Sequence, residues 1–283
     1  MSFTFMSAAE AASLIKDGEI LGLSGFTPAG TPKAVVSELA KIAEEKHACG
    51  EQFQVGIITG ASTGASCDGA LTRAKAISFR APYTTNTDFR KAVNNGEIRY
   101  TDIHLSQLAQ RLRSGFLGHV STAIIEACEI TDDGRIYLTA GVGVTPTVAR
   151  LADRIIVELN AAHSKNLIGM HDLYEMERPP YRRPIPIVRP SDRIGLPYIQ
   201  VDPSKIVGVV EVNIPDEARG FHDSDPVTDK IGQNVAEFLA ADMRRGVIPS
   251  TFLPLQSGVG NIANAVLSAL GKDSSIPPFE MYT

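Results

Sequence analysis

The amino-acid sequence predicts an α/β fold, built on an open, mostly parallel sheet with helices on both faces. Strand-like and helix-like segments alternate along most of the 283 residues, as they do in parallel sheets with helical crossovers. The expected strands are short apolar runs, which is typical of strands buried on both faces. Hydrophobic residues make up 43% of the chain and charged residues 21%, which suffices for a core and argues against wholesale disorder.

The first half of the chain is expected to begin with a helix over 7–15 and a buried strand that ends at Gly25. The amphipathic segment 31–48 predicts a long helix, with Thr31 as N-cap and Pro32 at the first helical position. The elements expected after it are a short helix over 87–96 and strands over 53–61, 76–82 and 98–105.

The second half is expected to open with a hairpin, in which 121–131 and 135–141 are joined by a turn at Asp133-Gly134. Residues 161–200 hold six prolines and show little periodicity, so they predict a long excursion over the surface. The remaining elements expected before residue 213 are a helix over 145–153 and strands over 154–160 and 205–212.

Three segments are expected along the chain: an N-terminal α/β domain over 1–215, a linker over 216–225, and the start of a second, similar α/β domain over 226–283. In the last segment, Asp225 is expected to cap a long helix that begins at Pro226. A strand over 251–256, a glycine turn and a helix over 262–271 are expected next. Because so few elements would bury little apolar surface by themselves, we expect a C-terminal part missing from this chain to complete this domain.

Composition narrows the classes of function. The formal net charge is −5 and Lys and Arg do not cluster, which argues against nucleic-acid binding. Cys49, Cys67 and Cys128 form no disulfide framework, which favours a reducing compartment. There is no secretory signal at the N-terminus and no stretch of about 18 apolar residues. We therefore expect a cytoplasmic protein that does not span a membrane.

Motifs for three common kinds of site are absent from the sequence. The six histidines show no metal-binding spacing such as H-x-x-x-H, so no metal site is expected. No G-x-S-x-G nucleophile elbow and no G-x-x-x-x-G-K-[ST] phosphate loop occurs.

A glycine turn over 258–263, with the sequence GVGNIA, lies between an expected strand and an expected helix. Converging backbone N–H groups in such a turn suit a phosphate or an oxyanion. The turn also fits the dinucleotide fingerprint, and Glu280 lies about 20 residues further on, where a ribose-binding acid is expected. A tight strand-to-helix connection without a ligand explains the pattern equally well.

Small residues also end three strands of the expected sheet. The segment 24–30, SGFTPAG, follows the first strand, 59–64 follows the next, and 141–143 follows the hairpin. Ligands bind at the carboxyl ends of strands in open α/β sheets, and glycine lets backbone approach a ligand closely. Together these strand ends predict a shallow pocket lined by backbone, although each could be an ordinary loop.

The sequence resembles the acetyl-CoA hydrolase/transferase family of class I CoA-transferases, which includes succinyl-CoA:acetate and propionyl-CoA:succinate enzymes. The resemblance lies in SGFTPAGTPKAV (24–35), LTAGVGVTPTVARLADRIIVELN (138–160) and LQSGVGNIANAVL (255–267). It implies the N-terminal half of an enzyme about twice this length, built from two related open α/β domains. Such an enzyme transfers CoA between a short-chain acyl-CoA and a carboxylate of the acetate, succinate or propionate type, or hydrolyses acyl-CoA.

The resemblance also implies a set of site residues. A glutamate would attack the thioester and carry CoA as a glutamyl thioester, while backbone N–H groups at Val259 and Gly260 would stabilise the oxyanion. No tightly bound cofactor is implied, and CoA is a substrate. The residues implied to border the acyl group or CoA are Ser24, Gly25, Phe26, Thr27, Pro28, Ala29, Gly30, Gln256, Gly258 and Asn261.

The glutamate nucleophile is expected just beyond Thr283, because the family's glutamate follows a segment like the terminal FEMYT. A C-terminal half or a second subunit would then supply it, and the complete enzyme is expected to form a dimer. A split enzyme, a truncation and a cleavage before the glutamate each explain this arrangement. Two other functions stay open: a non-catalytic CoA- or nucleotide-binding module, and an NAD-dependent oxidoreductase that uses the GVGNIA turn.

Overall fold

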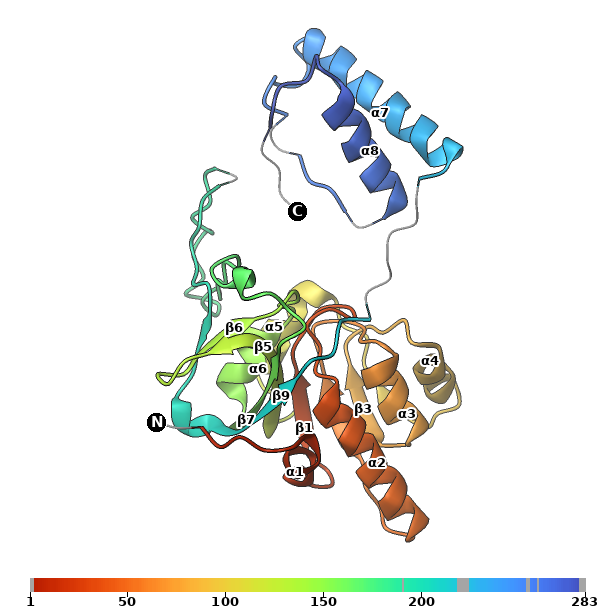
Figure 1. Ribbon diagram of the computed structural model, residues 1–283, viewed down its shortest axis with the longest axis vertical. Helices are drawn as coiled ribbons and strands as arrows, with labels where there is room; N and C mark the ends of the chain where they lie inside the picture. Colours follow the sequence, from red (N-terminus) through yellow and green to blue (C-terminus); the bar gives the residue numbers. More distant parts are fainter. Residues whose placement is uncertain (1–2, 190, 218–223, 253–254, 259, 280–283) are drawn as a thin grey trace. The chain divides into compact units, whose positions relative to one another are not determined.

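The computed structural model describes residues 3–189, 191–217, 224–252, 255–258 and 260–279 (Figure 1). The chain divides into two compact units. Unit 1 holds Met1–Pro184 and Ile194–Ala218, and unit 2 holds Ile185–Arg193 and Arg219–Thr283. Each unit is described separately.

Unit 1 is built on one sheet, to which the described residues contribute nine strands. Seven of them are mutually parallel in the order β4-β3-β2-β1-β5-β7-β9. The antiparallel strands β6 and β8 extend the sheet beyond the end of β1. The bounds are β1 Ile20–Leu23, β2 Val55–Ile58, β3 Ile77–Ala81, β4 Arg99–Tyr100, β5 Thr122–Ile130, β6 Arg135–Leu138, β7 Arg154–Asn160, β8 Ile199–Gln200 and β9 Ile206–Val212.

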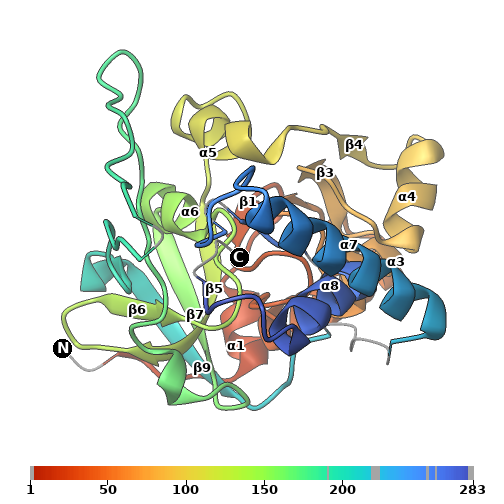
Figure 2. The same cartoon turned by 90° about the horizontal axis from the view of Figure 1, so that it is seen from above.

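Helices cover both faces of this sheet, which confirms the predicted fold class (Figures 1 and 2). One apolar core joins the sheet to α1 (Ala8–Ser13), α2 (Ala34–Ala48), α3 (Ala70–Arg73) and α4 (Thr87–Asn94). A second core on the opposite face joins it to α5 (Leu105–Arg113) and α6 (Thr145–Leu151). Consecutive residues of a strand face opposite sides, so Ile124 lies in the first core and Ile125 in the second.

The chain order of the parallel strands reverses between β1 and β5. From β1 the chain proceeds outward through β2 and β3 to β4, whereas β5 leads through β7 to β9 on the other side. Loops diverge at such a switch point, so the carboxyl ends of β1 and β5 leave room for a ligand. The predicted small-residue segment 24–30 follows β1 at this position.

The predicted start of the helix over 31–48 is wrong. Helix α2 begins at Ala34, and Lys33 occupies the N-cap without using its side chain as a cap. The carboxylate of Glu158 instead accepts hydrogen bonds from the backbone N–H groups of Lys33, Ala34 and Val35 at 2.7–3.2 Å. Thr31 and Pro32 fit the local sequence pattern of a helix start. The acceptor for the first N–H groups of α2 comes instead from Glu158, on the distant strand β7.

Two other predicted strands differ from the structure, and a short helix was not predicted. The expected strand over 98–105 is paired only at Arg99 and Tyr100, and α5 begins at Leu105, because β4 is the edge strand and the chain leaves the sheet there. Helix α3, with the π-helical turn Ala65–Gly69 before it, was not predicted. In the expected strand over 251–256, residues 253–254 lie outside the described part, and its described residues form no strand element.

The excursion over 161–200 has little regular structure, as predicted. Its described residues form a 3-10 turn at Lys165–Leu167 and strand β8, and a bridge joins Leu173 to Leu196. Most of its other described residues are exposed or half-buried.

Unit 2 contains α7 (Pro226–Arg244) and α8 (Asn261–Lys272), and the predicted start of α7 is confirmed. Asp225 accepts hydrogen bonds from the N–H groups of Val227 and Thr228, which completes a capping box. The two helices pack closely at Gly232, where a Cβ atom would lie 2.6 Å from the carbonyl oxygen of Ala265. None of the described helices has the length and apolar character needed to cross a membrane.

The environments of the cysteines predict their reactivity. Burial raises the pKa of the Cys67 thiol to about 12, and it also raises the pKa of Cys128, whereas Cys49 is exposed. Only thiolates react with iodoacetamide, so we expect alkylation of the folded protein at pH 8 to modify Cys49 and spare Cys67. Peptide mass spectrometry checks this, with urea-unfolded protein as the control in which all three react. Equal rates at Cys49 and Cys67 in the folded protein would contradict the structure.

Candidate functional site

The three small-residue strand ends meet in the structure. Gly25 and Gly143 form a parallel bridge between the end of β1 and the turn after β6. A Cβ atom on Gly60, after β2, would lie 2.5 Å from the carbonyl oxygen of Gly25 and 2.6 Å from the Cα of Gly143. A Cβ atom on Gly30 would lie 2.8 Å from the backbone nitrogen of Gly141. Backbone segments therefore contact one another directly at the carboxyl end of the sheet. We call Gly25, Gly30, Gly60, Gly141 and Gly143 the glycine junction.

The loop from Ser24 to Gly30 is held closed by its own hydrogen bonds. The Ser24 hydroxyl donates to the Gly30 carbonyl oxygen at 2.7 Å and accepts from the Glu126 N–H at 2.8 Å. Phe26 and Ala29 form a tight antiparallel bridge, with Thr27 at a φ of 56° between them. The Phe26 side chain remains 44% exposed. The loop therefore exposes Phe26, whereas the buried Ser24 hydroxyl links the two ends of the loop.

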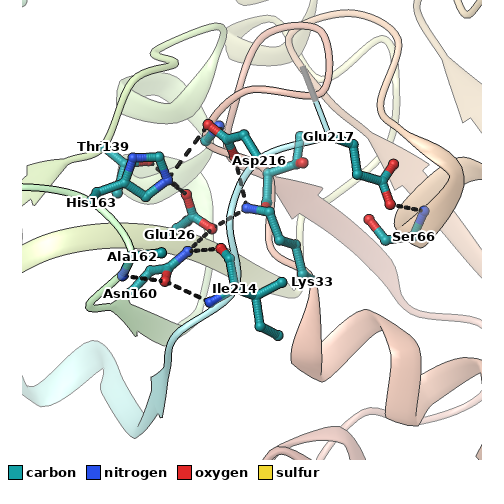
Figure 3. A network of polar contacts seen from close by, with 12 residues as sticks. Lys33, Ser66, Glu126, Thr139, Asn160, Ala162, His163, Ile214, Asp216 and Glu217 are labelled. Atoms are coloured by element: carbon teal, nitrogen blue, oxygen red, sulfur yellow. Dashed lines mark hydrogen bonds and ion pairs between the residues drawn. The ribbon is translucent and has the colours of Figure 1, made fainter. Parts of the chain in front are cut away.

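Beneath this loop lies a network of buried charges around Lys33 (Figure 3). The Lys33 ammonium lies 2.5 Å from Glu126 Oε2 and 2.9 Å from Asp216 Oδ1. Its side chain is 3% exposed and that of Glu126 is fully buried. The Lys33 ammonium, at the start of α2, therefore links β5 to the segment that follows β9.

Neutral donors complete the shell of Glu126. Thr139 donates to its Oε1 atom at 2.7 Å, and the Asn160 amide donates to Oε2 at 3.0 Å. The Nε2 atom of His163 lies 3.3 Å from Glu126 Oε1 and 3.5 Å from Asp216 Oδ2. Asn160 also donates to the Ile214 carbonyl oxygen at 2.7 Å. The carboxylate is therefore compensated on every side, as a buried charge must be.

The segment after β9 is fastened to the loops at the carboxyl ends of β1 and β2. Asp216 Oδ1 accepts from the N–H of Gly30 at 3.1 Å, and Glu217 Oε1 accepts from the N–H of Ser66 at 3.0 Å. Both acids lie at the start of the predicted linker over 216–225. Asp216 thus holds the 24–30 loop, and Glu217 holds the segment after β2.

Electrostatics favour the charged form of Lys33. Burial alone would lower the pKa of its ammonium, but hydrogen bonds and Coulomb attraction from Asp216 and Glu126 outweigh that penalty and raise the pKa above its ordinary value. Burial also raises the pKa of Glu158, while the α2 backbone N–H groups act in the opposite direction. Register places Glu158 opposite Glu126 on the neighbouring strand, so two fully buried acids lie side by side.

Glu126, His163 and Asp216 are the described residues whose ligand atoms lie close enough together, within 4.8 Å, to hold a metal ion. The Lys33 ammonium already contacts both carboxylates and supplies the positive charge that they require. The group forms a hydrogen-bonded ion-pair network in which the Lys33 ammonium contacts Oε2 of Glu126 and Oδ1 of Asp216.

The remaining predicted site residues lie in unit 2. Gln256, Gly258 and Gly260 precede α8, and Asn261 is its first residue. Gly260 has a φ of 148° and open space where a Cβ would be. Val259 lies outside the described residues, as does Glu280.

The sequence analysis missed the Lys33 network. Its signal was present in the two acids Glu126 and Glu158, each of which interrupts an otherwise apolar strand. A charge in the middle of a doubly covered strand needs a buried partner. Lys33, Asp216 and His163 carry no comparable local signal, because none of them interrupts an apolar strand.

The sheet with its switch point and the glycine junction define an α/β domain of the kind that binds ligands at the carboxyl ends of its strands. The family model of the acetyl-CoA hydrolase/transferase N-terminal domain matches residues 3–211. The chain belongs to this family, which confirms the resemblance drawn from its sequence.

Its relatives carry both activity names of the family. The chain is 43% identical over 281 residues to a propanoyl-CoA:succinate CoA transferase of Escherichia coli K12, covering 99% of this chain and 57% of the relative. It is 43% identical to a succinyl-CoA:acetate CoA-transferase of Clostridium kluyveri (94% and 49% covered) and 37% identical to an acetyl-CoA hydrolase of Schizosaccharomyces pombe (95% and 52% covered). The chain therefore spans about half the length of the curated relatives it matches.

Solved structures share the fold at lower sequence identity. RipA from Yersinia pestis superimposes with a TM-score of 0.66 at 18% identity, covering 98% of this chain and 55% of that one. A 4-hydroxybutyrate CoA-transferase from Porphyromonas gingivalis gives a TM-score of 0.55 at 19% identity, with 94% and 51% covered. The α/β architecture of this chain is thus one that known proteins adopt.

Proposed function

We propose that this chain forms the N-terminal part of an enzyme that transfers CoA between a short-chain acyl-CoA and a carboxylate, or hydrolyses acyl-CoA. The glycine junction carries the proposal, because it brings together the first two stretches in which the family resemblance lies, 24–35 and 138–160. Bare backbone at the carboxyl end of a sheet suits a small acyl group, because glycine lets a ligand approach the main chain closely. The names of the relatives support the same chemistry.

In the proposed reaction, a glutamate carboxylate supplied by a C-terminal part or a second subunit attacks the acyl-CoA carbonyl and expels CoA thiolate. The thiolate attacks the glutamyl carbonyl of the resulting anhydride, which releases the free acid and leaves a glutamyl-CoA thioester. An incoming carboxylate reverses both steps, whereas water would give hydrolysis. Backbone N–H groups at Val259 and Gly260 are proposed to stabilise the oxyanions, and the 24–30 loop borders the acyl group.

Three further parts of the proposal concern the setting of the enzyme. CoA acts as a substrate with no tightly bound cofactor, and the complete enzyme forms a dimer. We place it in the cytoplasm, which the three free cysteines support.

The test joins this chain to the part of the E. coli relative that it does not cover. We expect the chimera to move radiolabelled succinate into succinyl-CoA when it is given propionyl-CoA, as measured by chromatography of the CoA esters. Without an acceptor, the protein mass should rise by that of CoA less one water, because a glutamyl thioester has formed. The controls are the 283-residue chain alone and the chimera with its nucleophilic glutamate changed to glutamine, which should both be inert.

Two outcomes would count against the proposal. Turnover by the 283-residue chain alone would place the nucleophile within it. An inactive, folded chimera that binds NADH in a fluorescence titration would favour the oxidoreductase alternative.

A further inference from the structure

A cavity of about 670 Å³ lies within unit 1, beside the glycine junction. Its walls are α5, the first turn of α6 and the stretch 170–182, and its floor reaches Gly60 and Gly143. This volume lies within the range of small-molecule sites in proteins, roughly 300–1,000 Å³. The proposed reaction assigns it no role.

Part of the cavity lining is apolar. Phe26, Leu108, Val142, Pro146 and Met176 line it, and they come from the 24–30 loop, α5, the turn after β6, α6 and the excursion. Side chains from five separate segments converge here, so the apolar surface is a product of the fold. Such a surface fits the hydrocarbon part of a ligand.

Three arginines also line the cavity. Arg113, Arg178 and Arg182 line it, and none forms an ion pair with a carboxylate in the described part of the chain. Arg182 instead donates to neutral oxygens, the Gln110 side chain at 3.2 Å and the Glu177 carbonyl at 3.4 Å.

The two acids in the wall are already engaged. Glu175 pairs with Arg150 at 3.1 Å and accepts from Thr147 at 2.7 Å. Asp172 accepts from the N–H groups of Ile194 and Gly195 at 3.0 and 2.6 Å. Neither carboxylate forms an ion pair with the three lining arginines in the described part of the chain, although the charge of Glu175 attracts Arg113.

Arg113 has an unmet hydrogen bond. Its Nε atom is buried and has no hydrogen-bond partner among the described residues, although Nη1 donates to the Met176 carbonyl oxygen. Burial, together with repulsion from Arg150, Arg178 and Arg182, lowers the pKa of this guanidinium. A buried donor without an acceptor is costly, and a carboxylate or phosphate matches the geometry of a guanidinium.

We propose that this cavity binds a small organic anion, with its hydrocarbon part against Phe26, Val142 and Pro146 and its carboxylate or phosphate at Arg113 and Arg182. Two sources share this chemistry: the phosphate-bearing arm of an acyl-CoA and a free aliphatic carboxylate. Because Phe26 belongs to both the cavity and the 24–30 loop, a bound anion would lie next to the acyl group of the proposed reaction. Binding is a property of this chain, so a failed chimera assay would leave the inference standing.

The test is calorimetric titration of the 283-residue chain with two matched ligand pairs. Pantetheine 4′-phosphate is compared with pantetheine, and octanoate with octanamide. We expect at least one anion to bind about tenfold or more tightly than its neutral partner, which is the effect of one charge-assisted hydrogen bond. Preference for the phosphate identifies the acyl-CoA arm as the source, and preference for octanoate alone identifies a free carboxylate.

Variants locate the binding site. Arg113→Gln and Arg182→Gln should each weaken binding of the anion about tenfold and leave the neutral partner unchanged. Arg111→Gln is the control, because Arg111 lies on the same helix but stacks on Phe116 outside this cavity. Arg182 is exposed, so its variant stays informative if Arg113→Gln unfolds. Equal binding of anion and neutral partner, no binding of either anion, or unchanged affinity in folded variants would overturn the inference.

Discussion

Replacing Lys33 with methionine is expected to lower the free energy of unfolding by about 3–5 kcal/mol, the usual cost of removing one partner of a buried ion pair. Methionine keeps the length and helix propensity of lysine but leaves Glu126, which is fully buried, without its counterion. Asp216 would lose the same ammonium, and with it one of the ties that hold the segment after β9 against Gly30. Urea denaturation followed by circular dichroism measures the loss.

A matched control lies on the same helix. Lys41 pairs with Glu38 at 2.7 Å, but its side chain is 60% exposed. Lys41→Met should therefore change the stability by less than about 1 kcal/mol. If Lys33→Met costs no more than Lys41→Met, the network does not support the fold as described.

A double variant separates the lost attraction from the stranded charge. Lys33→Met with Glu126→Gln removes both charges, while the one amide oxygen of the glutamine can still accept from either Thr139 or Asn160, which bond to different oxygens of Glu126. We expect it to recover a large part of the loss, because most of the cost of the single variant comes from the uncompensated carboxylate. If the double variant loses as much free energy of unfolding as the two single variants added together, the cost comes from packing instead.

Replacing Gly143 with alanine is expected to lower the free energy of unfolding by about 2–5 kcal/mol. A left-handed backbone costs a non-glycine residue about 1–2 kcal/mol, and Gly143 has a φ of 53°. Overpacking adds about 1–3 kcal/mol. It arises because the new methyl group would overlap the Gly25 carbonyl oxygen and lie 2.9 Å from the Cα of Gly60. Backbone on both sides cannot rotate away as a side chain would.

Two further variants divide this cost into its parts. Gly96 has a φ of 74° and open space around it, so Gly96→Ala measures the conformational cost alone. Gly60 has an ordinary φ but is equally crowded, so Gly60→Ala measures the steric cost alone. Thermal and urea unfolding should rank Gly143→Ala as the least stable of the three. A Gly143→Ala variant as stable as Gly96→Ala would show that the junction can open.

The network and the junction act on the same loop from two sides. Asp216 holds Gly30 from the segment after β9, while the glycine contacts fix Gly25 against the turn after β6. We therefore expect variants that disrupt either the Lys33 network or the glycine junction to lower the activity of the chimera as well as its stability, because the 24–30 loop borders the proposed acyl site.

Much of unit 1 follows from signals that lie within a few residues of one another. The apolar runs 154–160 and 205–212 are strands β7 and β9, and the hairpin at Asp133-Gly134 joins β5 to β6. The start of α7 was predicted because Asp225 caps N–H groups only two and three residues away. Short elements such as α3 escaped prediction, since four residues are too few to show a helical period.

Periodicity and cap residues are local properties, so the α/β class, the buried strands and the small-residue turns at their ends could be predicted from the order of the residues. Which of those turns touch, and which charges are buried, depends instead on how distant segments pack together. Lys33 and Glu126 are 93 residues apart, and Glu158 caps a helix that begins 124 residues before it. Their meeting depends on strand order and on the register that sets Glu126 beside Glu158, and neither leaves a trace in the spacing of residues along one chain.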